Sequence, residues 1–432
     1  MQLQLRHPAK KLAVVAALSL LAASYFTLTT AAFLAAHFST EPDSAHLKRA
    51  AWLDPGNAEY RYRIGRYELL AGQSPQAAIP WLEAATALNP HSAKYWLDLA
   101  IARQSLGDTV SERPALAHAL AADPRTPEVA WQAANLYLAQ GSLDDAMREY
   151  RVVMENDPSL AAQAINLCWK MHPDIESLLR SVIPPNVYAS FLDFLVSNNE
   201  TAAAAKTWEK IFLSQQALER PALFAYMRHL IEHQEVAQAT MVWQQATNIS
   251  GLAAYQPSSE NILINGDFSL EVLNGGFDWL YQPTPGVSLA LDPNDAHSSS
   301  RSLRIIFDGP GIADAGIRQL VPVDPNTSYE FSGFYKAQDM DGAGGPKFAI
   351  QDLYTETSFF MSDDLRDSDF WRRIDGAFTT GPDTHLLLLR IARIPAGSPI
   401  RGKLWIDGLQ LVRTNPSGAS AEKESPPQSP SQ

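Results

Sequence analysis

The hydrophobic pattern divides the chain into three stretches that predict different elements. Residues 12–38 form a run of Leu, Ala, Val and Phe with interspersed Ser and Thr, and no side chain in it is charged at pH 7. Between residues 45 and 250, apolar residues recur at helical spacing. After Tyr255, turn-forming residues separate short runs of strand-forming residues. The pattern predicts a long apolar helix, an all-α region and an all-β region, in that order.

The apolar run is long enough to cross a membrane as a helix. At about 1.5 Å per residue it exceeds the hydrocarbon core of a bilayer, which is roughly 30 Å thick. Lys10 and Lys11 precede the run, and Glu41 and Asp43 follow it. Because a basic flank stays in the cytoplasm, residues 1–40 are predicted to be a cytoplasmic stub and one transmembrane helix in the inner membrane. The bulk of the chain is then periplasmic.

A cleavable secretory signal is the alternative for the same stretch. Residues 12–23 form a compact apolar segment, and small residues near Ala32 and Ala36 suit a signal peptidase. Cleavage would give a secreted protein instead of an anchored one. Both interpretations place the rest of the chain outside the cytoplasm.

Within the all-α region, a dipeptide that ends in proline recurs at nearly constant spacing. Successive prolines are 35, 34 and 34 residues apart, and three glycines keep a similar step. A period near 34 residues, with a turn glycine midway, is typical of stacked helical hairpins. The dipeptides are Asp54-Pro55, Asn89-Pro90, Asp123-Pro124 and Asp157-Pro158, and the glycines are Gly72, Gly107 and Gly141.

Residues 127–158 show one repeat position by position. The residues are Ala134 and Tyr137 on a first helix, Gly141 at a turn, Ala146 and Tyr150 on a second helix and Pro158 at the end. In these residues the chain resembles a tetratricopeptide repeat protein. The resemblance implies one helical solenoid over 45–250, with clear repeats at 58–158 and degenerate ones at 159–250. The unit before this one departs from the family at Glu112, where a small residue is usual.

The resemblance also implies a concave groove that binds protein or peptide partners, because stacked repeats bury one continuous core and leave an extended inner surface. Tyr62 and Trp131 have an alternative interpretation as packing residues between neighbouring repeats. The positions that match the family's groove are Tyr62, Arg66, Leu97, Ile101, Trp131 and Asn135.

The all-β region carries an ordered set of motifs. Runs such as 302–307 and 385–391 read as short strands between turn signals, which favours a β-sandwich. Together with the motifs, residues 260–413 resemble a carbohydrate-binding module of the family 4/9 type, which is a galactose-binding-like jelly roll. The matching segments are 261–268, 296–304, 329–337, 371–380 and 405–411.

The resemblance implies that the sandwich binds a polysaccharide. Such modules hold sugars with aromatic faces, while amide and carboxylate groups bind the hydroxyls. Some of the aromatic residues are expected in the core instead, and Trp371 and Trp405 are assigned there. The candidate sugar-binding residues are Trp279, Tyr281, Phe334, Gln351 and Asp352.

Many galactose-binding-like domains hold a structural calcium ion where the first and last strands meet. The resemblance points to Asp407, with Asp267 nearby, and oxygen ligands of this kind suit calcium. The chain departs from the family pattern at Gly408, where a second acid is common, and at Ser269, where a glutamate is common. Both outcomes, a retained and a lost calcium site, therefore stay open.

Charge and cysteine content exclude several classes. The formal net charge of −13 gives no electrostatic reason to expect nucleic acid. A single cysteine, Cys168, forms neither an intramolecular disulfide nor a multi-thiolate metal site. The polar segment 414–432 is predicted to be a disordered tail.

One motif is compatible with catalysis. His229, Glu232 and His233 fit the His-x-x-Glu-His pattern of zinc hydrolases. The motif lies in a degenerate repeat, where solvent-exposed helix histidines are the alternative. The sequence shows no phosphate-binding glycine loop and no nucleophile elbow, so we expect a non-catalytic protein that requires no cofactor.

These patterns support one main hypothesis and two alternatives. The main hypothesis is a membrane-anchored scaffold of the cell envelope, with repeats that bind protein and a sandwich that binds polysaccharide, in exopolysaccharide assembly or export. The second is a structural envelope assembly factor whose sandwich binds protein. The third is a zinc hydrolase that uses His229 and His233.

Overall fold

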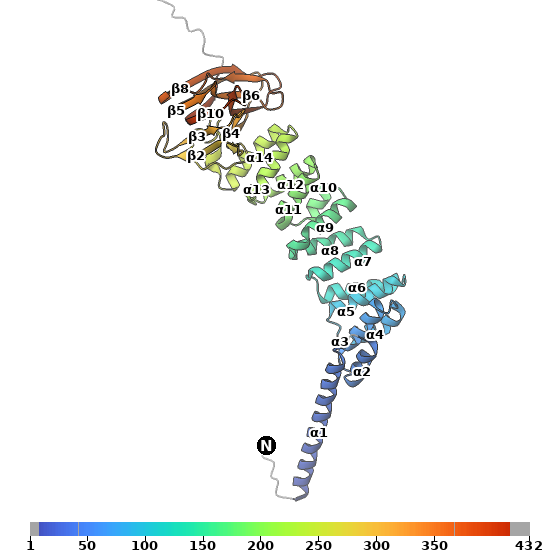
Figure 1. The fold of residues 1–432 in the computed structure, drawn as a ribbon. Coiled ribbons are helices and arrows are strands. Elements are labelled where there is room, and N and C mark those ends of the chain that lie inside the picture. The colour runs from blue at the N-terminus through green and yellow to red at the C-terminus, as the bar shows by residue number, and fades with distance from the viewer. Residues whose placement is uncertain (1–7, 42, 367, 415–432) are drawn as a thin grey trace, which may run out of the picture. The chain divides into compact units, whose positions relative to one another are not determined.

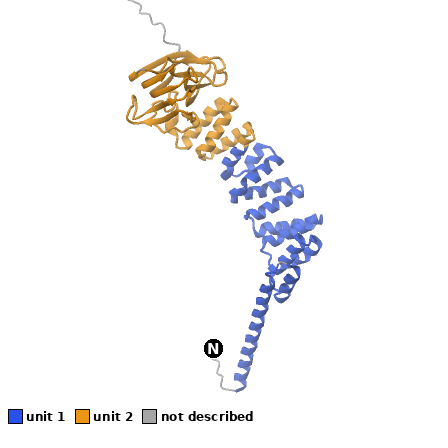
Figure 2. Cartoon of the chain, in the orientation of Figure 1, with its two compact units in different colours: residues 1–194 blue, residues 195–432 orange. Residues whose placement is uncertain are grey.

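The computed structural model describes residues 8–41, 43–366 and 368–414 (Figure 1). An apolar helix comes first, a series of helical hairpins follows, and two antiparallel sheets end the described chain, which confirms the predicted fold class. The chain divides into two compact units, Met1–Phe194 and Leu195–Gln432 (Figure 2). The predicted tail after Thr414 lies outside the described residues.

Helix α1 (Pro8–Phe38) contains the predicted membrane span. Its most apolar 18-residue window has a mean hydropathy of 1.9, so the helix is long and apolar enough to cross a bilayer or to serve as a signal sequence. Ala35 is the one residue of α1 that is buried. It packs with Leu47 and Ala50 of α2 (Ser44–Leu53) in a small hydrophobic cluster. The C-terminal end of α1 thus packs on the first helices of the repeat region.

The helical hairpins follow the proline and glycine spacing. Helices α3 (Ala58–Leu70), α5 (Ala93–Ser105) and α7 (Pro127–Ala139) start at successive steps of the repeat. Gly107 and Gly141 follow α5 and α7 with φ of 72° and 75°, a conformation that glycine adopts without a Cβ clash. The other helices of this unit are α4 (Pro75–Leu88), α6 (Thr109–Ala122), α8 (Leu143–Asn156), α9 (Pro158–Met171), α10 (Ile175–Ser177) and α11 (Tyr188–Ser197).

The second unit joins three helices to the β-sandwich. The helices are α12 (Thr201–Leu213), α13 (Arg220–Glu232) and α14 (Val236–Ile249). Sheet A has the strand order β1 (Leu280–Tyr281), β4 (Asp314–Pro322), β9 (Leu386–Ile394), β6 (Gly345–Asp352) and β7 (Ser358–Met361). Sheet B has the order β2 (Val287–Asp292), β3 (Ser302–Gly309), β10 (Ile400–Arg413), β5 (Ser328–Gly342) and β8 (Ser368–Thr379).

Alternation along the strands fills the space between the sheets. In β4, Ile317 and Val321 belong to the inter-sheet core, and Arg318 between them is exposed. In β9, Leu387 and Leu389 belong to the same core. Successive strand residues point to opposite faces, so Arg318, Leu388 and Arg390 lie on the outer face of sheet A. The largest buried core side chains include Phe268, Trp279, Phe331 and Phe348.

Helices α13 and α14 pack against the sandwich. The Tyr354 hydroxyl donates to the Ile231 carbonyl at the end of α13, at 2.8 Å. The loop that precedes β1 lies so close to these helices that a Cβ on Gly275 would overlap Phe224, and one on Gly276 would overlap Trp243. Glycine is therefore required at both loop positions.

Candidate binding surfaces of the β-sandwich

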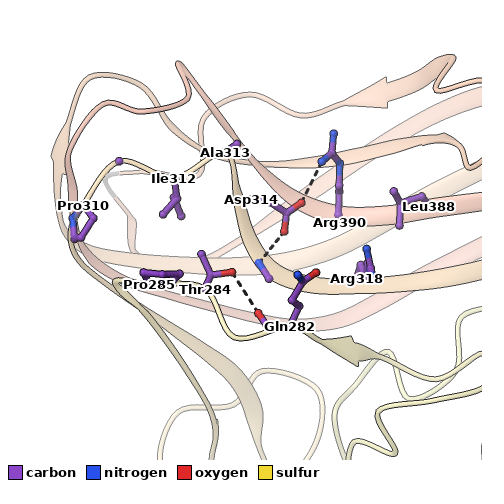
Figure 3. Close-up of a pocket in the computed structure, with 12 residues that line it drawn as sticks. Gln282, Thr284, Pro285, Pro310, Ile312, Ala313, Asp314, Arg318, Leu388 and Arg390 are labelled. Atoms are coloured by element: carbon purple, nitrogen blue, oxygen red, sulfur yellow. Dashed lines mark hydrogen bonds and ion pairs between the residues drawn. The ribbon is translucent and has the colours of Figure 1, made fainter.

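An open pocket of about 480 Å³ lies on the outer face of sheet A, and we call it the sheet A pocket (Figure 3). Its floor comes from β4 and β9, and the segments that follow β1 and β3 form its walls. Both polar and apolar side chains line it. The lining side chains include Gln282, Thr284, Pro285, Ile312, Asp314, Arg318, Leu388 and Arg390.

One of the two arginines in the pocket is held by neighbouring side chains. Arg390 donates through Nη1 to Asp314 Oδ2 and through Nη2 to Gln351 Oε1, both at 3.2 Å. Asp314 also accepts from the Gly316 amide at 2.7 Å. Arg390 Nε is buried without a partner among the described residues. Figure 3 shows the Asp314 carboxylate between the Arg390 side chain and the backbone of β4.

The other arginine is free to bind a ligand. Arg318 is exposed, and no group in residues 8–41, 43–366 and 368–414 forms a hydrogen bond or an ion pair with its side chain. Its strand register places it directly opposite Arg390, as Cα partners of β4 and β9. The pocket thus contains the guanidinium of Arg390, which is fixed by hydrogen bonds, and that of Arg318, which has no partner among the described residues.

A second pocket adjoins the first one. It has a volume of about 360 Å³ and lies between α13 and sheet A, with Phe224 and Ile231 on the helix side. Gln282, Arg318 and Leu388 line both pockets. The two pockets thus share part of their lining on the outer face of sheet A, and we call them together the sheet A groove.

Two of the predicted sugar-binding residues are buried. Trp279 is 1% exposed in the inter-sheet core, where its Nε1 donates to the Asn265 carbonyl at 3.1 Å. Both faces of its indole are covered by protein, so Trp279 offers no stacking surface to a sugar. Asp352 is also buried, and its Oδ1 accepts from the amides of Tyr354 and Thr355, which stabilises the turn after β6.

The other predicted residues lie on two different surfaces. Gln351 lies on sheet A and braces Arg390. Tyr281 is 38% exposed and lines the second pocket. Phe334 belongs to sheet B, on the face opposite the buried Tyr329 and Phe331, as its position in the strand predicts. The structure therefore does not bring the five residues together in one site.

Phe334 is part of an aromatic group on the outer face of sheet B. The imidazole of His297 stacks on it with ring centroids 3.6 Å apart, and Trp371 meets His297 edge to face at 5.7 Å. Trp371 is only partly buried and lies outside the inter-sheet core, so its assignment to the core was wrong. Trp405 is buried, with Lys336 above its ring at 5.5 Å and Asp292 accepting from its Nε1.

The surroundings of Asp407 do not fit a calcium ion. Its carboxylate is 0% exposed and accepts from the amides of His297, Ser298 and Gly408 and from the Ser298 hydroxyl, at 2.6–2.9 Å. Calcium requires oxygen ligands, whereas the groups that face this carboxylate are hydrogen-bond donors. Asp267 instead accepts from Ser269 within its own turn. In this chain Asp407 anchors the loop that carries His297.

The predicted groove residues of the repeats divide into packed and exposed ones. Tyr62 is buried, its ring lies 4.6 Å from that of Tyr95, and its hydroxyl accepts from Arg66 at 2.7 Å. Burial, with the nearby Asp98 charge, raises the pKa of Tyr62 to about 12. Leu97 is buried as well. The packing interpretation therefore describes the surroundings of Tyr62.

The other predicted groove residues of the helical repeats are exposed or partly exposed to solvent. Arg66 and Asn135 are exposed, and Ile101 and Trp131 are partly exposed. Trp131 packs edge to face on Tyr150 at 5.4 Å, and the Tyr150 hydroxyl donates to Asn135.

The two histidines of the zinc-like motif lie close together but make other contacts. Their ring centroids are 4.2 Å apart. His229 is buried with its Nε2 beside the Thr201 hydroxyl at 2.9 Å, and its pKa is lowered by burial and by His233. Among the described residues, no group of three or more His, Cys, Asp or Glu side chains is placed to hold a metal ion.

No family model matches the chain, and no curated protein matches it. Solved structures similar to parts of it include a crystal structure of MamA protein, with a TM-score of 0.30 and 21% identity over 45% of this chain and 98% of that chain. A structure described as "CBM4 structure and function" has a TM-score of 0.27 and 15% identity, over 35% and 99% of the two chains. A Family 16 Carbohydrate Binding Module-2 has a TM-score of 0.26 and 18% identity, over 35% and 99%. Each likeness covers less than half of the chain, so none identifies the whole protein.

Proposed function

We propose that this protein is a non-catalytic scaffold of the cell envelope that binds a polysaccharide through its β-sandwich and protein partners through its helical repeats. The observation that carries this proposal is the sheet A pocket. Amide, hydroxyl, carboxylate and guanidinium groups converge there beside the apolar surface of Leu388 and Pro285. Sugar hydroxyls need such donors and acceptors, and the apolar wall suits the C–H face of a sugar ring.

The adjacency of the two pockets supports a polymer as the ligand. The second pocket shares three lining residues with the first, so neighbouring sugar units of one polymer can occupy both pockets. The ordered motifs of residues 260–413 favour the same ligand class. More specifically, we propose a role in exopolysaccharide assembly or export. Such a role requires both polysaccharide binding and the extracytoplasmic location that we propose for the sandwich.

The polysaccharide proposal predicts that obstruction of the sheet A pocket abolishes glycan binding. Ala313 is exposed at the pocket wall, so Ala313→Trp should fill the cavity without disturbing the core. We expect the full chain in detergent to bind at least one member of a panel of soluble polysaccharide fragments in calorimetric titrations. Ala313→Trp should weaken that binding by about tenfold or more.

The matched control is Ala377→Trp, which adds the same side chain to an exposed position of β8 in sheet B. This variant should bind as the wild type does. If a folded wild-type chain binds no fragment of a broad panel, a protein-binding sandwich becomes the better proposal. If Ala377→Trp abolishes binding while Ala313→Trp does not, the glycan site lies on sheet B with the aromatic group around Phe334.

We propose further that α1 is retained as an anchor. Its last turns pack on the first helices of the repeat region, because Ala35 packs with Leu47 and Ala50. Cleavage after Ala36 would remove one side of that cluster. We therefore expect protein extracted from membranes to have an intact mass that includes residues 1–38. A mature N-terminus beyond Ala32, on a soluble exported protein, would show that the helix is a signal peptide.

A further inference from the structure

Building on the proposed polysaccharide site, we infer that its ligand is an acidic polysaccharide and that Arg318 binds a carboxylate of a uronic acid unit. The first argument is the strand register. Arg318 and Arg390 are direct cross-strand partners of β4 and β9. Like charges directly opposite each other destabilise an antiparallel pair. Asp314 offsets the charge of Arg390, and an anion bound to Arg318 would offset the other charge.

The protein supplies one carboxylate for these two cations. Asp314 pairs with Arg390 and takes its remaining hydrogen bond from the Gly316 amide. Arg390 is further fixed by Gln351. Arg318 has no such partner among the described residues, so its whole guanidinium fork is available. A planar fork of this kind binds a carboxylate through two parallel hydrogen bonds.

The two arginines and Asp314 leave one positive charge in excess, and the other charges along the groove do not neutralise it. On α13, Arg228 and Glu232 line the second pocket and offset each other. Lys347, on the same face of sheet A, is paired with Asp364 at 2.8 Å. The groove thus has one positive charge more than it has negative charges, in a chain whose net charge is −13. The positive position is local to the pocket and not a property of the whole surface.

The lining side chains also suit a charged sugar better than a neutral one. None of the described residues that line the sheet A pocket is aromatic, so ring stacking does not dominate recognition there. The Gln282 side chain lines the same pocket, and so does the Thr284 hydroxyl, which donates to the Gln282 carbonyl at 3.3 Å and can still accept a hydrogen bond from a sugar hydroxyl. A carboxylate held by the guanidinium supplies the main attraction, and the amide and hydroxyl select the neighbouring positions.

Calorimetric titration of the full chain in detergent with matched pairs of oligosaccharides tests this inference. The probes are oligomers of galacturonate, mannuronate and glucuronate, each with its carboxyl-reduced neutral counterpart. We expect at least one acidic oligomer to bind about tenfold or more tightly than its neutral counterpart. Arg318→Gln should remove this preference, because the substitution deletes the positive charge while it keeps an amide that can bind a sugar hydroxyl. Raising the salt from about 50 mM to about 500 mM should weaken acidic binding in the wild type.

The control is Arg372→Gln, which removes an exposed arginine from β8 on sheet B and should keep the full preference. Equal binding of acidic and neutral oligomers, or a preference that survives in Arg318→Gln, would overturn the inference and leave the polysaccharide proposal intact. Absence of binding to every oligomer by a folded wild-type chain, together with no binding to the neutral panel, would overturn both.

Discussion

Asp407→Ala is expected to destabilise the sandwich by about 4 kcal/mol, because it leaves several buried donors without a partner. The carboxylate accepts from three backbone amides and one hydroxyl, all between 2.6 and 2.9 Å. Each buried donor that loses its acceptor costs about 1–3 kcal/mol. The variant should therefore lower the thermal midpoint of the full chain in detergent, followed by tryptophan fluorescence.

The same variant tests how His297 is positioned. Two of the lost hydrogen bonds hold the His297 and Ser298 amides, and they fix the loop from which His297 stacks on Phe334. Gly408 is confined as well, because an added Cβ would approach Ser298 Oγ to 2.7 Å. Loss of Asp407 should release this loop and make it accessible to proteolysis before the rest of the sandwich unfolds.

Asp267→Ala is the matched control, since it removes a carboxylate that accepts only from Ser269 at a partly exposed turn. It should cost less than about 1 kcal/mol. A chelator should leave the wild-type midpoint unchanged, because donors surround the Asp407 carboxylate. A fall in the midpoint that calcium restores and magnesium does not would support the predicted calcium site.

The repeat architecture was predictable because its signal is local. A proline can follow a helix end and a glycine can adopt a positive φ whatever the distant parts of the chain do. Gly107 and Gly141 stand where the spacing placed them. Asp157 in turn caps α9 by accepting from the Ser159 amide. The strands of the sandwich were also predictable, since alternation is a property of each short segment.

The candidate site was not predictable, because it depends on pairings between distant segments. Arg318 and Arg390 lie on different strands, and only the β4–β9 register places them opposite each other. One available signal was that each is a charged residue flanked by apolar residues, Ile317 before Arg318 and Leu389 and Ile391 around Arg390. The assignment of Trp279 to a sugar-binding site failed because its neighbours in sequence do not reveal that it packs in the core, with its ring centroid 5.2 Å from that of Phe268. His297 and Ser298, which donate hydrogen bonds to Asp407, are likewise remote from it in sequence.

Asp278→Asn is expected to stabilise the second unit at neutral pH. Asp278 is 0% exposed, its Oδ2 accepts from the Leu273 amide at 2.7 Å, and its Oδ1 has no partner among the described residues. Burial raises the pKa of this carboxyl from 3.8 to about 6 in the folded chain. The folded state therefore favours the protonated, neutral form, which an asparagine reproduces in shape.

The sign of the pH dependence follows from this raised pKa. The stability contribution of the neutral carboxyl is complete below pH 3.8 and is lost as the pH rises through 6. At about 1.4 kcal/mol per pH unit, ionisation costs the fold about 3 kcal/mol. Asp278→Asn should match the wild type near pH 4 and exceed it by up to about 3 kcal/mol near pH 8.

The location of Asp278 determines where this effect should be seen. The preceding residues Gly275 and Gly276 lie against Phe224 and Trp243, and Phe277 meets Trp243 edge to face. Ionisation of Asp278 thus strains the loop that packs on α13 and α14. Denaturant titrations between about pH 4 and about pH 8 measure the difference, with Asp324→Asn as the control because Asp324 forms an exposed ion pair with Arg413. Parallel pH profiles for the wild type and Asp278→Asn would show that this carboxyl titrates normally and that the loop bears no cost from its charge.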